Sequence, residues 1–283
     1  MSGQTSTVRR WQLGQRLRGL RERAGIEAKA AALEIEVSPA TMSKIETGRP
    51  LVRPLYVKAL TTLYGADSVE QAALAALAAE AGQPEWFAAQ AKHIPDWFKL
   101  YLGYESAADE LRSYSVELVD GLLQTPAYAR AITTAGRPES GEEELRTKIG
   151  VRLQRQKRLT SGNPLTLHAI LNEAVLHRIV GGPEVMRAQL NHLVELSRRP
   201  NITVRILPFS AGAHPAMAAA FSLLRFEACP GMNTVYLENG RGALYLDAAA
   251  DLARYNWVFG ELRGLALGPG KSRSLLVRVA RQL

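Results

Sequence analysis

The chain has 283 residues, of which 47% are hydrophobic and 22% charged, proportions that are ordinary for a soluble globular protein with room for two domains. No apolar run reaches the ~18 residues of a membrane-spanning helix, and the single cysteine, Cys229, excludes an internal disulfide and fits a reducing cytoplasm. The net charge of +8 is concentrated in residues 1–65, which hold 11 Lys and Arg against 5 Asp and Glu, as expected for a segment that contacts phosphates.

Signals for a first group of helices follow in close succession. Met1 to Trp11 lacks the apolar segment of a signal peptide, so we predict a short disordered arm there. Leucines then repeat at helical spacing up to Gly25, which suits a helix end. Further helices are predicted at residues 28–35, within 38–49, and at 54–64 and 68–81. Three residues, 36–38, separate the second helix from the body of the third, which is a helix-turn-helix layout.

The stretch at residues 38–49 has the signals of a short, exposed helix. Ser38 is a strong N-cap, Pro39 suits the first helical position, and Gly48 is expected to end the helix in a left-handed conformation. Its outer face is small, polar and singly basic, so it can enter a DNA major groove and bring hydroxyls and a lysine to base edges or phosphates. Taken alone, the pattern fits any capped surface helix equally well.

Three motifs in residues 11–66 have the order and spacing of a known DNA-binding fold: Leu13-Gly14-x-x-Leu17-Arg18-x-Leu20-Arg21, Val37-Ser38, and Ser43-Lys44-Ile45-Glu46-x-Gly48-Arg49. Through them the segment resembles the lambda-repressor-like, or Cro-like, helix-turn-helix family (XRE family). The resemblance implies base-edge contacts from Pro39, Ala40, Thr41, Ser43 and Lys44. It implies phosphate contacts from Arg18, Lys29, Arg49 and Arg53. The family usually opens its second helix with Gln or Thr; here Ala28 and Lys29 stand there, so that contact would pass to Lys29.

A break at Gly82-Gln83-Pro84 marks the end of the helical region. The predicted domains are a helix-turn-helix domain at 1–82, a connector at 83–96 and a mixed α/β domain at 97–283. Aromatic residues cluster across the junction and are expected to form core or an interface rather than a stacking platform for nucleic acid: Trp86, Phe87, Trp97, Phe98, Tyr101 and Tyr104.

The second half of the chain mixes helices and strands. Helices are predicted at residues 104–114, 142–159, 173–180, 183–197, 247–265 and 272–281. Strands are predicted at residues 165–171, 202–207, 221–226, 234–237 and 243–246, with Asn239-Gly240 as a hairpin turn between the last two. The strands at 165–171 and 202–207, with two helices between them, predict one βαβ-like unit. The fold class is therefore α+β: an all-α five-helix domain followed by a mixed α/β domain with a small mixed sheet.

Candidate binding residues are spread over this second half. The helix predicted at 142–159 carries a basic run that includes Arg152 and Arg155; such a run is typical of a solvated face, and a ligand or partner carboxylate is its alternative use. His214 lies in a loop after a strand, where a plain loop histidine is the alternative to a binding role. Glu173 and Glu238 lie at or near strand ends and are candidates on the same ground.

A series of short motifs in this half keeps a recognisable order: Gly121-Leu122-Leu123-Gln124-Thr125-Pro126-x-Tyr128-Ala129, Arg152-Leu153-x-Arg155-Gln156, Leu171-x-Glu173-x-x-Leu176, Gln189-Leu190-x-x-Leu193, Val204-Arg205-Ile206-Leu207-Pro208, Gly212-Ala213-His214, Tyr236-Leu237-Glu238 and Tyr245-Leu246-Asp247. Through them, residues 97–280 resemble the C-terminal domain of actinobacterial helix-turn-helix regulators, a group with WhiJ-like developmental regulators and antitoxin-like proteins. One departure is Asp120, where the group usually has Pro. The resemblance implies a small partner protein encoded nearby.

Sequence patterns of catalysis and metal binding do not occur. The five histidines show no His-x-x-x-His spacing, the lone cysteine allows no Cys-x-x-Cys pair, and there is no Gly-rich phosphate loop. We therefore expect no catalytic residue, no metal and no cofactor, and we expect that the chain is not an enzyme.

The sequence thus predicts a cytoplasmic transcriptional regulator that binds double-stranded DNA as a homodimer. Residues 11–66 would read DNA, and residues 97–283 would dimerise and sense a ligand or a small partner protein. The alternative is an antitoxin-like protein that neutralises a small partner and autoregulates its operon. An enzyme fused to a DNA reader is a third interpretation.

Overall fold

Five helices with short connections make up residues 6–81. The computed structural model describes residues 5–136, 138 and 141–283. The first helices are α1 (Ser6–Arg23), α2 (Ala28–Glu34), α3 (Pro39–Glu46), α4 (Pro54–Leu63) and α5 (Ser68–Ala81). The helices predicted after Gly25 are confirmed, because their caps and apolar spacing are local signals. Their ends differ from the prediction by a few residues at most.

The start of α1 corrects the predicted disordered arm. Residues 1–4 lie outside the described residues, but from Ser6 onward the chain is helical, and the Thr5 side chain caps the helix by accepting a hydrogen bond from the Val8 amide. Two polar side chains hold this extra turn: the Ser6 hydroxyl donates to the Gln83 carbonyl, and Thr7 Oγ1 donates to a Glu85 carboxylate oxygen, each at 3.0 Å. Residues 6 and 7 are held by partners distant in sequence, which a local pattern does not reveal.

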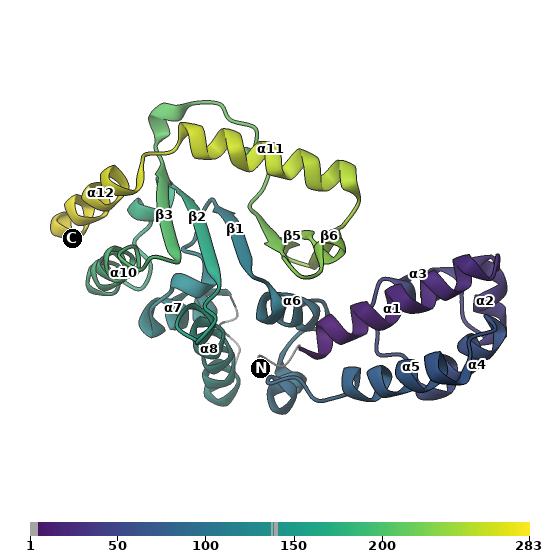
Figure 1. Ribbon diagram of the computed structural model, residues 1–283. Helices are drawn as coiled ribbons and strands as arrows, with labels where there is room; N and C mark the ends of the chain where they lie inside the picture. The colour runs from purple at the N-terminus through teal and green to yellow at the C-terminus, as the bar shows by residue number, and fades with distance from the viewer. Residues whose placement is uncertain (1–4, 137, 139–140) are drawn as a thin grey trace. The chain divides into compact units, whose positions relative to one another are not determined.

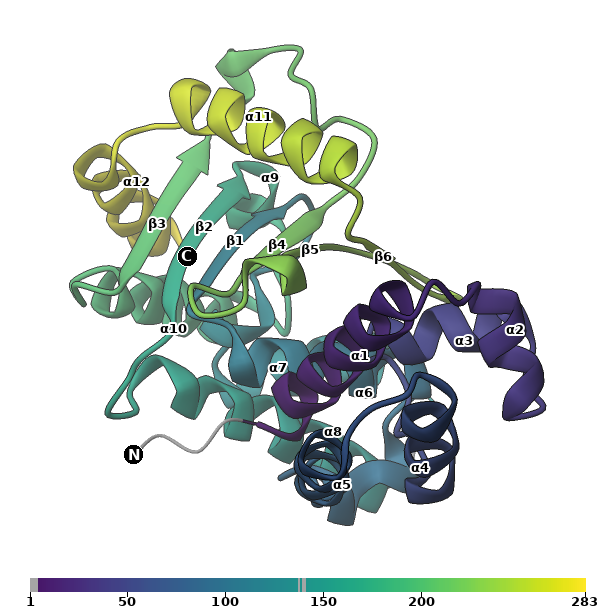
Figure 2. The ribbon, with the colours of Figure 1, turned by 45° about the vertical axis from the view of Figure 1, so that its right-hand side comes forward.

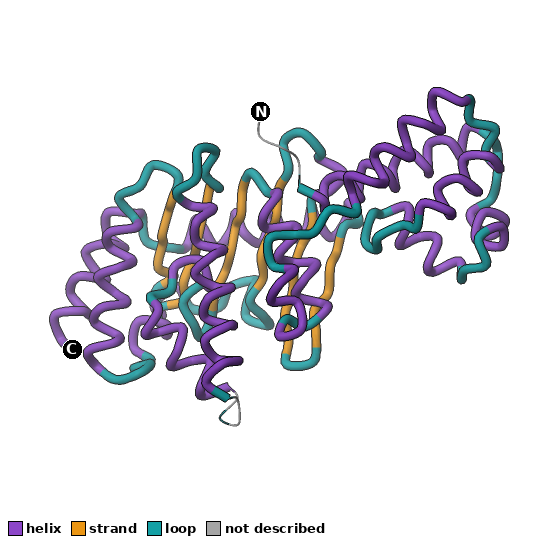
Figure 3. The backbone as a smooth tube through the Cα atoms, turned by 90° about the horizontal axis from the view of Figure 1, so that it is seen from below, coloured by secondary structure: helices purple, strands orange, loops and turns teal. Residues whose placement is uncertain are grey.

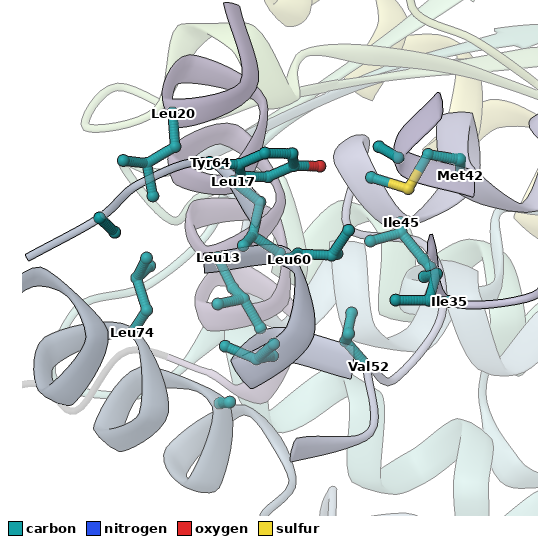
Figure 4. Packing of buried hydrophobic residues seen from close by; sticks show 14 of the residues in the cluster. Leu13, Leu17, Leu20, Ile35, Met42, Ile45, Val52, Leu60, Tyr64 and Leu74 are labelled. Atoms are coloured by element: carbon teal, nitrogen blue, oxygen red, sulfur yellow. The ribbon is translucent and has the colours of Figure 1, made fainter. Parts of the chain in front are cut away.

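Apolar side chains from α1 to α5 fill one core (Figure 4). Leu13 and Leu17 of α1, Met42 of α3 and Leu60 of α4 are each at most 1% exposed. Burying a side chain of this size stabilises the fold by about 1.5–3 kcal/mol. The inner stripe of α3 is therefore anchored, and its outer face is left to the solvent.

The chain divides into two units. Unit 1 comprises Met1–Ala89 and Leu102–Ala107, and unit 2 comprises Gln90–Tyr101 and Ala108–Leu283. Strands are confined to unit 2 among the described residues (Figure 3), so the fold class is α+β as predicted. Helix α6 (Asp96–Ala107) contributes residues to both units. Within the described ranges, no helix is both long and apolar enough to cross a membrane.

A six-stranded mixed sheet organises unit 2. Its strands are β1 (Glu110–Ser115), β2 (Thr166–Asn172), β3 (Ile202–Leu207), β4 (Phe221–Arg225), β5 (Thr234–Asn239) and β6 (Gly242–Leu246). The strands lie side by side in the order β3-β2-β1-β4-β5-β6 (Figure 2). The first three are mutually parallel and the rest pair antiparallel, which confirms the βαβ unit between β2 and β3 and the hairpin at Asn239-Gly240.

Strand β1 corrects the helix predicted over residues 104–114. Helix α6 ends at Ala107, and Glu110–Ser115 become a central strand between β2 and β4. The segment has side chains that alternate between two faces: Leu111 and Ser113 point to one, Arg112 and Tyr114 to the other. Pairing with strands more than 50 residues away, rather than local propensity, decides its conformation.

Helices cover both faces of the sheet. They are α7 (Pro126–Gly136), α8 (Glu142–Gln156), α9 (Ala174–His177), α10 (Pro183–Leu196), α11 (Ala249–Leu265) and α12 (Pro269–Gln282). Phe259 and Leu262 of α11 pack against Tyr114, Leu223 and Val235 on one face. Helices α7, α8 and α10 lie on the other side of the strands from α11 (Figure 1). The predicted helix at 173–180 shortens to the single turn of α9.

Candidate functional site

Helix α3, the predicted reading helix, has the local geometry that its sequence predicts. The Ser38 hydroxyl accepts a hydrogen bond from the Thr41 amide at 3.1 Å, and Pro39 begins α3. Gly48 adopts a φ of +70°, the left-handed conformation expected of a helix-ending glycine. Met42 and Ile45 are buried on the inner side. Capping at both ends makes this two-turn helix a defined surface feature.

The predicted base-contact residues occupy the outer face of α3. Pro39, Ala40, Ser43 and Lys44 are exposed, and Thr41 is half-buried with its hydroxyl 2.9 Å from the Ser38 hydroxyl. In the described part of the chain, the Lys44 ammonium has no bonded partner, so it is available to a base edge or a phosphate. Their contacts with DNA stay a prediction.

The predicted phosphate-contact residues differ in their surroundings. Lys29 and Arg53 are exposed, and Arg49 is half-buried. Arg18 is exposed but its Nε donates to a Glu22 carboxylate oxygen at 2.7 Å, so it must exchange that partner to reach a phosphate. An exposed pair of this kind contributes little to stability, and the exchange is therefore inexpensive.

A buried ion pair that sequence reasoning missed joins α1 to α3. Arg21 donates from Nε and Nη2 to the two carboxylate oxygens of Glu46, at 2.6 and 3.1 Å. The hydrogen bond to Glu46 holds the pKa of Arg21 above its ordinary value. Arg21 also donates to the Ile26 carbonyl at 2.9 Å. The pair thus fixes α3 and the turn after α1 against each other.

Two glycines allow the backbones of α1 and the α3 end to approach closely. A Cβ on Gly14 would lie 2.5 Å from the Ile45 carbonyl oxygen, and one on Gly48 would lie 2.3 Å from the Trp11 Cα. Both distances are shorter than any real contact, so these positions require glycine. These two close backbone approaches and the Arg21–Glu46 ion pair together hold α3 in position against α1.

Unit 2 contains a cavity of about 520 Å³ on the sheet face opposite α11. This volume lies in the range of small-molecule sites. Residues of the sheet floor, of α6 and α8, and of the segment that leads from β1 to α7 line it, among them Ser113, Ser222, Tyr236, Phe98, Tyr101, Asp120, Gln124, Arg152 and Arg155.

Glutamines hold the cavity wall in place. Gln124 is buried; its amide nitrogen donates to the Val119 carbonyl at 2.6 Å and its amide oxygen accepts from Arg152 Nη1 at 2.5 Å. Gln156 donates to the carbonyls of Gly121 and Gln124, at 3.1 and 2.7 Å. The Gly-Leu-Leu-Gln-Thr-Pro and Arg-Leu-x-Arg-Gln motifs, 28 residues apart at Gln124 and Arg152, therefore meet at one wall.

The two predicted arginines lie in contrasting settings within the cavity. Burial, reinforced by the nearby Arg155 charge, lowers the pKa of Arg152 to about 10. Arg155 is buried, and its guanidinium carbon lies 5.2 and 5.4 Å from the ring centres of Phe98 and Tyr101. Cation–π contact stabilises that charge at a distance within about 6 Å. Arg155 is thus part of the wall, while Arg152 is the cation more open to a ligand.

Acidic groups of the cavity are already engaged. The Tyr236 hydroxyl donates to a Glu238 carboxylate oxygen at 2.7 Å, and burial raises the pKa of Tyr236. Asp120 caps the following 3-10 turn by accepting from the Leu122 amide at 2.9 Å, which is the local consequence of the aspartate at this position. Glu117 pairs with Arg178.

Glu173 and His214 lie outside the set of residues that lines the cavity. Glu173 accepts from the Phe209 amide at 2.7 Å and so ties the end of β2 to the turn after β3. His214 Nε2 lies 3.3 Å from the Tyr114 hydroxyl, on the α11 side of the sheet, and burial lowers the pKa of His214. The structure therefore brings together Arg152, Arg155 and Glu238 and leaves these two elsewhere.

Several cavity residues were missed by sequence reasoning. Ser113 and Ser222 face each other in the β1–β4 register, and Tyr236 lies on the neighbouring strand. A serine in a strand carries no signal of its own. Gln124 and Tyr236 do lie in the motifs by which residues 97–280 resemble the actinobacterial regulators, and those motifs were the signal that could have identified them.

Comparison with known families finds two matches, one in each half of the chain. The family described as "Helix-turn-helix domain" matches residues 12–74, which supports a DNA-binding regulator. The family described as "Domain of unknown function (DUF5753)" matches residues 98–278, more than half of the chain. No curated protein and no solved structure shows a significant match. The chain therefore belongs to the DUF5753 family and carries a helix-turn-helix domain ahead of the family's own domain.

Proposed function

We propose that the protein is a sequence-specific transcriptional regulator of the lambda-repressor-like type, acting in the cytoplasm, with α3 as its recognition helix. The observation that carries the proposal is the helix-turn-helix match over residues 12–74, together with the exposed Lys44 on α3, whose ammonium bonds to no described residue. The local excess of basic residues in the first 65 positions supplies the attraction to phosphates.

Unit 2 is the regulatory part of this proposal and has no enzymatic role. Its cavity is of small-molecule size and carries Arg152, Arg155 and Glu238. Its resemblance to the C-terminal domain of WhiJ-like regulators favours an effector that is either a small molecule or a small partner protein. The unit would also supply the homodimer contacts, since α11 exposes Trp257 and Leu265.

The test is a randomised-site DNA selection with the full chain, followed by anisotropy titrations on the enriched sequence. We expect a defined motif and saturable binding. Lys44→Glu should abolish binding to it, because a carboxylate on the groove face repels the phosphates. Lys58→Glu is the control, because Lys58 is an exposed lysine of α4. A selection that returns no motif, or equal losses for both variants, would refute α3 as the reading helix.

The antitoxin-like alternative makes the second unit a neutraliser of a toxic partner. It predicts that an adjacent small open reading frame encodes a product that arrests growth alone and is harmless when co-expressed with this chain. Growth curves of the two strains decide between a dedicated regulator and an autoregulating antitoxin.

A further inference from the structure

The cavity in unit 2 has an apolar side as well as a charged one. Val116, Leu118, Ile132 and Met217 line it, and of these Leu118 and Met217 are 41% and 69% exposed. Large apolar side chains left open to water around a concave site are typical of ligand-binding surfaces. The ligand should therefore have an apolar body.

Two polar residues of the cavity, Ser113 and Arg152, have N–H or O–H donors that no described residue accepts. Ser113 is 2% exposed, lines the cavity, and its hydroxyl has no hydrogen-bond partner among the described residues. Arg152 donates one hydrogen bond, to Gln124, within the described part of the chain, so its other N–H donors are unused. The buried Ser113 hydroxyl is costly without a partner, and a ligand acceptor would remove that cost.

The cavity carboxylates do not compete for the same role. Glu238 already accepts the Tyr236 hydroxyl, and Asp120 accepts the Leu122 amide. Each of these carboxylates is already turned toward a donor of the protein, whereas Arg152 keeps N–H groups that no described residue accepts, so an anion is favoured over a cation. The two carboxylates still act on Arg152 through their charge, so a doubly charged anion such as phosphate is disfavoured relative to a single negative charge.

We propose that this cavity binds a small organic acid, a monocarboxylate with an apolar body. Its carboxylate accepts the unused N–H groups of Arg152, with the Ser113 hydroxyl as a further donor, because guanidinium and carboxylate form charge-assisted hydrogen bonds of matching geometry. Its apolar body lies against Leu118 and Met217. The acid would be the effector of the proposed regulator. Only this role as an effector depends on the proposed function; binding of the acid does not.

Calorimetric titration of the full chain, without DNA, tests the chemistry directly. The probes are phenylacetate and hexanoate, with phenylacetamide, phenethylamine and phenyl phosphate as matched neutral, cationic and largely dianionic compounds at about pH 7.5. We expect at least one carboxylate to bind with a dissociation constant below about 1 mM. The amide, the amine and phenyl phosphate should bind at least ~10-fold more weakly, since each lacks the single negative charge or adds a second one.

Variants assign the binding to this cavity. Arg152→Gln should weaken carboxylate binding about 10-fold or more. Ala219→Trp, in an exposed segment that lines the cavity, should block it by filling space without touching the core. Arg146→Gln removes an exposed arginine of the same helix α8 and should leave binding unchanged. A thermal melt of each variant shows that it is folded.

The outcomes separate the two proposals. Absence of carboxylate binding, equal binding of phenylacetamide or the amine, or full binding by folded Ala219→Trp would overturn the organic-acid site while leaving DNA recognition intact. Acid binding by a chain that selects no DNA motif would overturn the proposed function instead. Release of the selected DNA on titration with the bound acid would support both.

Discussion

Lys44 is the long side chain at the centre of the exposed α3 face, flanked by residues too short to reach far into a groove. We expect Lys44→Ala to relax base preference at one position of each half-site, since a lysine contact to a guanine edge is worth about 1–3 kcal/mol of discrimination. Randomised-site selection with the variant and with Lys58→Ala as control measures this. An unchanged motif would make Lys44 a phosphate anchor.

Removing one partner of the Arg21–Glu46 ion pair should lower the free energy of unfolding more than replacing both partners. Arg21→Ala leaves the Glu46 carboxylate buried, at 7% exposure, without its partner, and should cost about 3–5 kcal/mol of unfolding free energy. The double variant Arg21→Met, Glu46→Leu should lose less than Arg21→Ala, because it buries no unpaired charge. Urea unfolding of the three proteins measures the difference. A double variant as unstable as the single one would show that the pair's charge is not what matters.

Gly25 and Gly48, each after the end of a helix, allow the cost of a positive φ to be separated from the cost of a steric clash. Gly25 and Gly48 have φ values of +68° and +70°, but a Cβ on Gly25 meets nothing within 4 Å, whereas one on Gly48 meets the α1 backbone. Gly25→Ala should therefore cost only the left-handed strain, about 1–2 kcal/mol. Gly48→Ala should cost more and should weaken DNA binding, because α1 and α3 must separate. Thermal melts and anisotropy titrations of both variants test this, and equal effects would contradict it.

Elements with strong local signals could be predicted from the sequence, and elements decided by distant partners could not. Ser38 and Pro39 specify the start of α3 within a few residues, so α3 was predicted correctly. Glu110–Ser115 was predicted as helix because its strand conformation depends on β2 and β4. Arg152 and Glu238 could be named as candidates from a basic run and a strand end, and both line the cavity. Ser113 could not be named, because its place at the cavity depends on the register of β1 with β4.

Salt dependence reports the number of phosphate contacts made by the whole protein. If Arg49 and its neighbours contact phosphates, log affinity should fall with log salt by about 0.9 per contact, and Arg49→Ala should flatten the slope by about one unit. Arg146→Ala, in unit 2, is the control and should leave the slope unchanged. Anisotropy titrations over a range of salt concentrations measure both. A response to salt that is flat for the wild type would exclude phosphate neutralisation as the source of affinity.

Specificity against a genome requires more base contacts than one short helix makes. We therefore expect the full chain to sediment at twice its monomer mass and to select a pseudo-palindromic operator, with half-sites one helical turn apart or a multiple of it. Analytical ultracentrifugation with and without the operator tests this. A monomer that binds a single, asymmetric site would contradict the dimer.

The alternation of β1 has a consequence for how this protein can diverge. Tyr114 and its neighbours build the packed layer under α11, whereas Ser113 and Ser222, one step away on the same strands, form the cavity floor. Tyr114 and Phe221 of the packed layer also border the cavity, but a side chain substituted at Ser113 or Ser222 points to the other face of the sheet. If the cavity binds the proposed effector, descendants of one gene can acquire new ligands by substitutions at a few floor and rim positions, with less loss of stability than a change in the packed layer would cause.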